Sequence, residues 1–447
     1  MEEIIGIIGL LLGIVIMIAV AFTGLHAVPL TLLAGAVICI FNGINIWTGF
    51  SESWAAGVGT AFTSYFLLFF VSSCFANIME MTGACTAIAN QFIKWFGKEH
   101  IITVLILFIF LLCYGGVSFF VVLFAVGPIM RKLFEELNIP WKLSNLCFVA
   151  GGGCWVLAMP GSTQLSNVIP TALGTNLIAA PVLGLVCCAA GMACSIIYAE
   201  RTYKKEMALV VAGKSEGYVA PKNTSIQEMK DRSLPGALNA FLPIIVLIAI
   251  IVGCSVADVF ESSTMLACLA MLIALLVCLA LNYRYLPAEK KGLFKNMFSS
   301  SAASASSSAL VLGAVIGFGN IVAATDAFQT IINWLVNLDI SVYIKAVLST
   351  SVISGICGSA SSGAQLCMNY MGEYFINSGA NLNILHRLIA MASVTFDSLP
   401  HASGVFIGMS YLGLTHKQCY KYGFVTCTVF PTIIVWIATL VVSFMGI

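Results

Sequence analysis

Two prolines inside apolar stretches mark positions where this chain could bind a solute. Pro160 lies in the segment MPGSTQ (159–164), and Pro400 lies in SLPHAS (398–403). Proline removes a backbone N–H and clashes with the preceding helical turn, so each helix is predicted to break there. Within a membrane, such freed backbone is tolerated only where protein or a water-filled cavity covers it. Both breaks are therefore candidate binding positions.

Two further breaks divide apolar runs that are too long for one membrane crossing. The runs 101–130 and 343–371 are interrupted by YGGVS (114–118) and CGSASSG (357–363). Each run has about 30 residues, whereas one crossing needs about 20. We predict two re-entrant helical hairpins, each entering and leaving on one side. A single tilted helix is the alternative, but it gives the glycines and serines in mid-span no role.

The four breaks together predict a site for a small anion that carries hydroxyl groups. Glycines let backbone approach a ligand, and helix N-termini present partial positive charge to it. Serine, threonine and glutamine add neutral donors. The predicted substrate-binding residues are Tyr114, Gly115, Gly116, Ser118, Gly161, Ser162, Thr163, Gln164, Gly358, Ser359, Ser361, Ser362, His401 and Ser403.

Proton coupling is predicted for Asp397 and His401, which flank the second proline. A histidine titrates near neutral pH and could carry a proton beside a carboxylate. The alternative is that His401 only hydrogen-bonds backbone freed by the break. Asp326 is a third candidate, although helix capping at the membrane surface is the favoured interpretation for it.

The composition predicts an all-α polytopic membrane protein. The chain is 60% hydrophobic and only 9% charged, and its net charge of +1 gives no basic surface for nucleic acid. Its 16 cysteines include no CxxC or His-spaced pair, so we expect neither a metal nor a cofactor. The motifs GxxxxGK[ST] and HExxH are absent from the sequence, and a GxSxG nucleophile elbow is not expected, which argues against a nucleotide-driven pump or an enzyme.

A faint internal repeat suggests how these elements are arranged. Adding 243 to residue numbers pairs Ser64 with Ser307, Asn77 with Asn320, and Ser118 with Ser361. We predict two inverted-topology repeats, 1–200 and 237–447, joined by a cytoplasmic linker, 201–236. Each repeat has three spans, a hairpin (101–130 or 343–371), a broken helix (143–175 or 388–415) and a final span. Inverted repeats with matching breaks are typical of secondary transporters.

The distribution of positive charge supports this topology. In it, all Lys and Arg residues except Lys345 and Arg387 are cytoplasmic, as the positive-inside rule requires. Both termini are then predicted outside. No arginine is expected at mid-depth.

Around the breaks, the sequence resembles the gluconate permease (GntP) family of proton-coupled permeases, part of a larger ion transporter superfamily. The resemblance lies in YGGVS followed by FFVVLFAVGP (119–128), in MPGSTQ continuing through NVIPT (167–171) to APVLG (180–184), and in DSLPH (397–401) continuing to GLTHK (413–417). The family pattern often has proline where this chain has Thr163, and a small polar residue where it has Ala402. These departures leave the substrate open.

The resemblance implies a homodimeric permease in the bacterial inner membrane, with the hairpin-bearing parts moving as an elevator against a scaffold. The expected substrate is gluconate, a related sugar acid or a hydroxy monocarboxylate, taken up with a proton. Alternatives are a permease for D-serine or another small amino acid, a sodium-coupled dicarboxylate or citrate transporter, and a passive anion channel.

Overall fold

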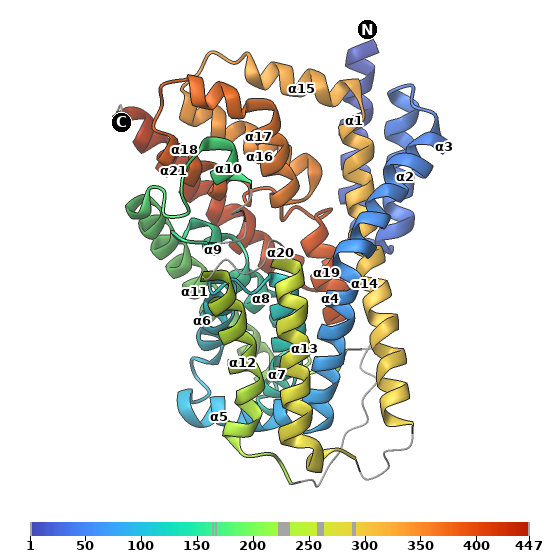
Figure 1. Ribbon diagram of the computed structural model, residues 1–447, viewed down its shortest axis with the longest axis vertical. Coiled ribbons are helices and arrows are strands. Elements are labelled where there is room, and N and C mark those ends of the chain that lie inside the picture. Colours follow the sequence, from blue (N-terminus) through green and yellow to red (C-terminus); the bar gives the residue numbers. More distant parts are fainter. Residues whose placement is uncertain are drawn as a thin grey trace.

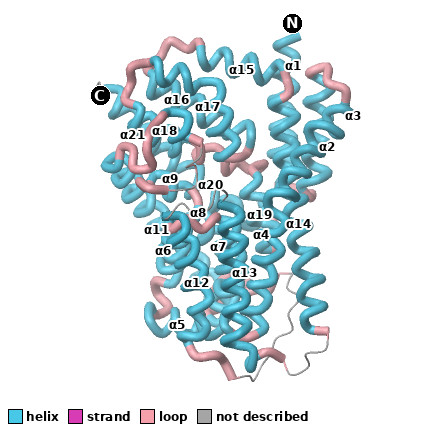
Figure 2. The backbone as a smooth tube through the Cα atoms, viewed as in Figure 1, coloured by secondary structure: helices cyan, strands magenta, loops and turns pink. Residues whose placement is uncertain are grey.

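The protein is all-helical in a computed structural model that describes residues 2–162, 165, 168–221, 233–256, 263–287 and 292–445 (Figures 1 and 2). No strand occurs within these ranges. Thr163 and Gln164 of the predicted site lie outside them, as do Lys222, Lys230, Arg232, Lys290 and Lys291 of the predicted cytoplasmic charges.

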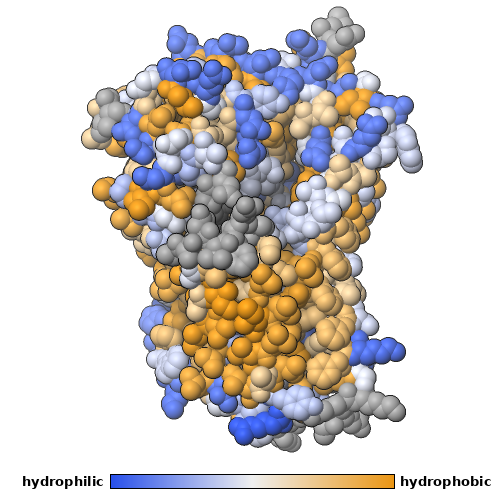
Figure 3. All heavy atoms as spheres, in the orientation of Figure 1, coloured by the Kyte–Doolittle hydropathy of each residue, from blue (hydrophilic) through white to orange (hydrophobic). Residues whose placement is uncertain are grey.

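Seven described helices are long and apolar enough to cross a membrane, and an eighth span is reached if the bent pair α5 and α6 counts as one. This confirms a polytopic membrane protein. In Figure 3, apolar side chains cover most of the lower half of the visible face, and hydrophilic ones gather at its upper end and along its lower rim. The seven are α1 (Glu2–Ala21), Ile46–Met81, α11 (Pro181–Val211), α12 (Ala237–Val256), α13 (Ser263–Asn282), α14 (Leu293–Ala323) and His416–Met445.

The composite span Ile46–Met81 contains α3 (Ile46–Thr48), η1 (Gly49–Trp54) and α4 (Ala55–Met81), and it follows the shorter α2 (Ala27–Phe41). α4 packs antiparallel on α14. At one end, the missing side chain of Gly57 lets α4 touch the backbone of Gly317. At the other, Asn77 Nδ2 donates to Ser301 Oγ at 2.9 Å. Small residues allow such close packing where lipid offers no hydrophobic driving force.

Each of these two long helices leads into a short helix that the sequence analysis did not separate. α5 (Ala84–Phe96) follows α4, and α15 (Asp326–Val336) follows α14. Figure 1 shows them at opposite ends of the molecule, with α15 near the two chain termini. α12 packs on α5, and α1 packs on α15.

The two predicted hairpins are pairs of helices joined by short breaks. The first is α6 (Ile101–Tyr114) and α7 (Phe119–Glu136); the second is α16 (Val342–Cys357) and α17 (Ala360–Asn377). Both first helices end at a glycine, and both second helices start after a serine whose hydroxyl accepts a backbone N–H of the first turn. The break between α16 and α17 is shorter than the break between α6 and α7.

Both predicted broken helices are interrupted. The first consists of α8 (Ser144–Gly152), α9 (Cys154–Ala158) and α10 (Ile169–Leu173), preceded by η2 (Trp141–Leu143). The second consists of α18 (Leu382–Ala392) and α19 (Ser403–Leu412), followed by α20 (His416–Phe424), η4 (Val425–Val429) and α21 (Phe430–Met445). η3 (Tyr283–Tyr285) ends the α13 region. α11 continues to Val211, so the predicted linker is helical over its first 11 residues.

Candidate functional site

A cavity of about 390 Å³ lies where the two hairpin tips and the second broken helix meet. This is within the usual size range of small-molecule sites. Eight predicted residues line it: Gly116, Ser118, Gly358, Ser359, Ser361, Ser362, Asp397 and Ser403. Among the described lining residues none is Lys, Arg or His, and Asp397 is the single acidic one.

Both hairpin tips aim a helix N-terminus at the cavity. Ser118 caps α7 by accepting the Val121 N–H at 3.4 Å, and Ser359 caps α17 by accepting the Ser362 N–H at 3.3 Å. The preceding turns need glycine, because Gly116 has φ 94° and Gly358 has φ 61°. The partial positive charge of two helix ends therefore faces one space.

The second break is fastened to the tip of the second hairpin. The Ser403 N–H donates to the Gly358 carbonyl at 3.0 Å, and His401 Nε2 donates to the Gly355 carbonyl at 2.7 Å. His401 is 0% exposed and is not among the lining residues. Its ring thus satisfies a carbonyl near the end of α16 from behind the cavity wall, while its predicted coupling role stays a prediction.

Asp397 is the predicted coupling residue that reaches the cavity. Its carboxylate accepts from Ser398 Oγ at 2.8 Å and from the backbone N–H of Ala360, the first residue of α17. The second break therefore places an acidic group against the helix end that faces the cavity. Carboxylates are stabilised at that end of a helix.

The first break is fastened to the first hairpin in a comparable way. The Tyr114 hydroxyl donates to the Pro160 carbonyl at 3.0 Å, and the Gly161 N–H donates to the Leu177 carbonyl at 2.8 Å. This break contributes Leu157 and Leu165 to the lining. Of the predicted residues, Tyr114, Gly115, Gly161 and Ser162 are described but lie outside the lining.

Asp326 lies away from the cavity, in the exposed first turn of α15. Thr325 is the N-cap of that helix and accepts the Phe328 N–H at 3.1 Å. A carboxylate in a first helical turn is favoured by the helix dipole, which agrees with the capping interpretation.

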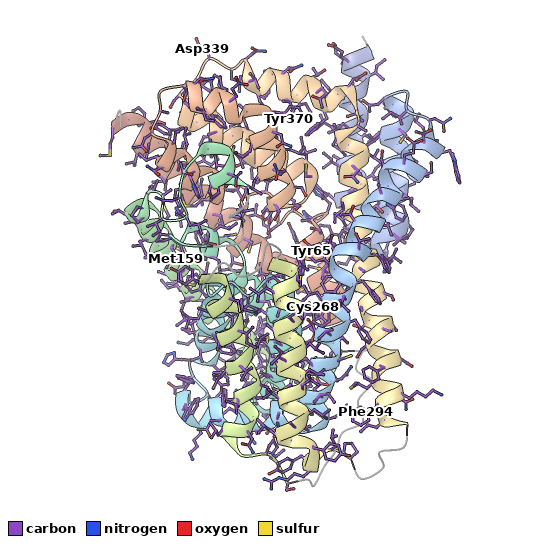
Figure 4. The ribbon with its side chains drawn as sticks, viewed as in Figure 1. Tyr65, Met159, Cys268, Phe294, Asp339 and Tyr370 are labelled. Carbon is purple, nitrogen blue, oxygen red and sulfur yellow. The ribbon has the colours of Figure 1, made fainter. Side chains whose placement is uncertain are left out.

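Several residues that line the cavity were not predicted from the sequence. Tyr65 on α4, Asn145 on α8 and Tyr420 on α20 line it from helices without a break at those positions. Figure 4 shows Tyr65 at about the same height as Met159 of the first break. In the sequence, each of these three lining residues is only a polar group within an apolar run, and many buried helices have such a residue.

Arg387 is a further residue whose contacts the sequence analysis did not predict. Its predicted place on the outer side of the membrane stays a prediction. It lies within α18, is 2% exposed, and donates to backbone carbonyls on both sides of the first break. Lys345, the other residue predicted on the outer side of the membrane, is also buried, at 4% exposure in α16. The sequence did show that each cation lies within a short apolar helix, which is a sign that its side chain has partners inside the protein.

Comparison with known proteins identifies the family of the chain. The family model described as GntP family permease matches residues 4–446. The chain belongs to the GntP permease family. It is also 29% identical over 395 residues to an uncharacterized transporter, YxjC, of Bacillus subtilis (strain 168), covering 80% of this chain and 82% of that protein. The resemblance seen at the breaks is thereby confirmed, and the protein is a transporter.

Proposed function

We propose that this GntP permease is a secondary active transporter that takes up a small organic acid together with a proton. The substrate class is gluconate, a related sugar acid or a hydroxy monocarboxylate. The observation that carries the proposal is the convergence of two capped helix N-termini and one carboxylate, Asp397, on a single cavity. Helix ends and serine hydroxyls suit a hydroxylated anion, and Asp397, with His401 behind it, is proposed to carry the proton.

Two inverted repeats are part of this proposal. In their support, α4, α5, α6 and α7 recur in order and in similar lengths as α14, α15, α16 and α17. Contacts also cross between halves in a reciprocal manner, since α1 packs on α15 and α12 packs on α5. A two-fold axis between antiparallel α4 and α14 would relate both sets. The same scheme carries the proposed orientation, with both termini outside the inner membrane.

We propose alternating access of the elevator type, because the two hairpins pack differently against the long helices α4 and α14. α7 packs on α4, and Arg131 Nη1 of α7 contacts Glu80 Oε1 of α4 at 2.9 Å. Among the described residues, no comparable packing joins α17 to α14, their counterparts in the repeat. The cavity would then be closed at the α5 end and accessible from the α15 end.

A polar stripe on α17 supports access from the α15 end. Ser362, Gln365, Asn369 and Glu373 are exposed at helical spacing, beginning at the cavity. In Figure 3, hydrophilic side chains gather at that end of the molecule. We propose that this stripe lines the aqueous approach of the substrate.

The decisive experiment is uptake into proteoliposomes. An acid-outside gradient should drive saturable accumulation of gluconate, and a protonophore should abolish the accumulation while leaving exchange. Thermal shift against sugar acids, hydroxy monocarboxylates, dicarboxylates and D-amino acids would rank substrates, since a ligand that binds only folded protein raises its stability. A substrate-dependent current without saturation would instead indicate a channel. Uptake that depends on sodium and not on protons would overturn the proposal that the coupling ion is a proton.

One observation favours a second candidate, a permease for D-serine or another small amino acid. The carboxylate of Asp397 could pair with a substrate ammonium group while a helix end binds the substrate carboxylate. Competition decides between them: D-serine would inhibit gluconate uptake with the lower half-maximal concentration if the amino acid is preferred.

A further inference from the structure

Arg387 is held by five hydrogen bonds inside the protein. Its Nη1 donates to the carbonyls of Leu157 (3.1 Å) and Met159 (2.8 Å). Its Nη2 donates to those of Leu177 (3.1 Å) and Ala179 (2.9 Å), and its Nε also donates to Ala179 (3.1 Å). A guanidinium has five N–H groups, so every donor is used.

The four carbonyls lie on the two sides of the first break. Leu157 and Met159 end α9, while Leu177 and Ala179 precede α11. The Gly161 N–H inside the break also donates to Leu177 at 2.8 Å. Gly184 lets α11 approach the end of α9, because a Cβ there would collide with the Ala158 carbonyl oxygen and would lie 3.1 Å from Arg387 Cδ. Arg387, in the second half of the chain, therefore links the end of α9 to the residues just before α11 in the first half.

The charge of Arg387 has no acidic partner in the described part of the chain, where none of the three ion pairs includes it. Carbonyl dipoles at the end of α9 are its compensation. One of them belongs to Leu157, which itself lines the cavity. A fixed positive charge therefore stands directly behind the cavity wall, where low exposure to water keeps it weakly screened.

We propose that Arg387 is a positioning residue that shapes the first break and supplies the fixed positive charge that attracts the substrate anion. This rests on the proposed transport of an organic acid and deepens it. All of its donors are occupied, so Arg387 acts through Leu157 and its neighbours and does not touch the substrate. Asp397 carries a negative charge in the same site. When Asp397 takes up a proton, the charge of Arg387 leaves the site net positive for an anion.

Two substitutions separate shape from charge. Arg387→Lys keeps the charge, but its ammonium has three donors and no planar fork. Arg387→Gln removes the charge. Lys345→Gln is the matched control, because Lys345 is also buried in the second half but donates to the Val336 carbonyl and lies over the Tyr374 ring.

Hydrogen exchange of the full-length protein tests the positioning role without transport. Both Arg387 variants should exchange faster over residues 157–181 than wild type, with α16 and α17 unchanged. Lys345→Gln should exchange faster in α16 and α17 and should leave residues 157–181 unchanged. Unchanged exchange over 157–181 in both Arg387 variants would overturn the positioning role, and if Arg387→Gln does not fold, the lysine variant decides.

Gluconate uptake kinetics test the charge role. Arg387→Gln should raise KM about tenfold or more with a smaller change in Vmax, and Arg387→Lys should raise it less, because one weakly screened charge is lost only in the first. The difference should persist at high salt. Equal KM in the two variants would overturn the charge role. If wild type fails to transport gluconate, the proposed substrate is wrong. The charge role is then tested with thermal shifts of the same variants, induced by the organic acid that stabilises wild type most in the screen.

Discussion

Glu80 at the end of α4 and Arg131 on α7 form an ion pair of 2.9 Å whose side chains are only 9% and 14% exposed. It joins the proposed scaffold to the proposed moving hairpin. Adding 243 places Ala323 at the position equivalent to Glu80, and aligning the caps Ser118 and Ser359 places Gly372 at the position equivalent to Arg131, so the equivalent positions carry no ion pair. Because this ion pair forms only when α7 packs on α4, it would lower the energy of that proposed transport state relative to a state in which the two helices separate.

Breaking this pair is expected to destabilise the closed α4–α7 contact. Glu80→Gln or Arg131→Met should each lower stability by about 1–3 kcal/mol, since one partner is left buried and unpaired, and the double variant should cost less than the sum. Thermal unfolding measures this. Lys132→Gln is the control, because the Lys132–Glu135 pair is about one-third exposed and such pairs contribute about 0–1 kcal/mol. Additive losses would contradict coupling between Glu80 and Arg131.

Asp397→Asn is expected to uncouple transport from the proton gradient. Asparagine keeps the size of the side chain and can still accept from Ser398 and Ala360, but it cannot take up a proton. Gradient-driven accumulation of gluconate should be lost, while exchange between internal and external gluconate continues. Asp326→Asn, in the exposed first turn of α15, serves as the control and should retain accumulation. Loss of both activities in Asp397→Asn would reduce Asp397 to substrate binding or structure.

His401→Ala should abolish accumulation more strongly than exchange if His401 carries the proton. It should also lower stability by about 1–3 kcal/mol, because the buried Gly355 carbonyl loses its donor. His416→Ala is the matched control: its Nε2 donates to the Pro400 carbonyl, also at 2.7 Å, from a buried position. Equal ratios of accumulation to exchange in the two variants would leave His401 a structural role only.

Gly57 and Gly59 on α4 should respond oppositely to alanine. A Cβ on Gly57 would collide with the backbone of Gly317, whereas nothing lies within 4 Å of a Cβ on Gly59. Gly57→Ala should therefore destabilise the protein by about 1–3 kcal/mol, and Gly59→Ala should be neutral or stabilise by up to about 1 kcal/mol. Thermal unfolding of both variants is the test. Similar shifts would argue against close α4–α14 contact as the source of stability.

The positions of the helix breaks were predictable because their causes are local. Pro160 and Pro400 cannot continue a helix, and glycine tips end α6 and α16 near the expected residues. The register was less predictable. The sequence repeat paired Ser118 with Ser361, but the two serines that cap the hairpin helices are Ser118 and Ser359. A short gap in a tip shifts the cap without changing composition or hydropathy.

The sequence by itself determined that this is a helical membrane protein with four breaks, and its motifs identified the family. Apolar content, proline and glycine act within a few residues, so they can be read along the chain. Tertiary structure alone decided that Asp397 lines the cavity while His401 lies behind it, and that Arg387 bonds carbonyls more than 200 residues earlier in the chain. These relations depend on packing between distant helices, which local preferences do not encode.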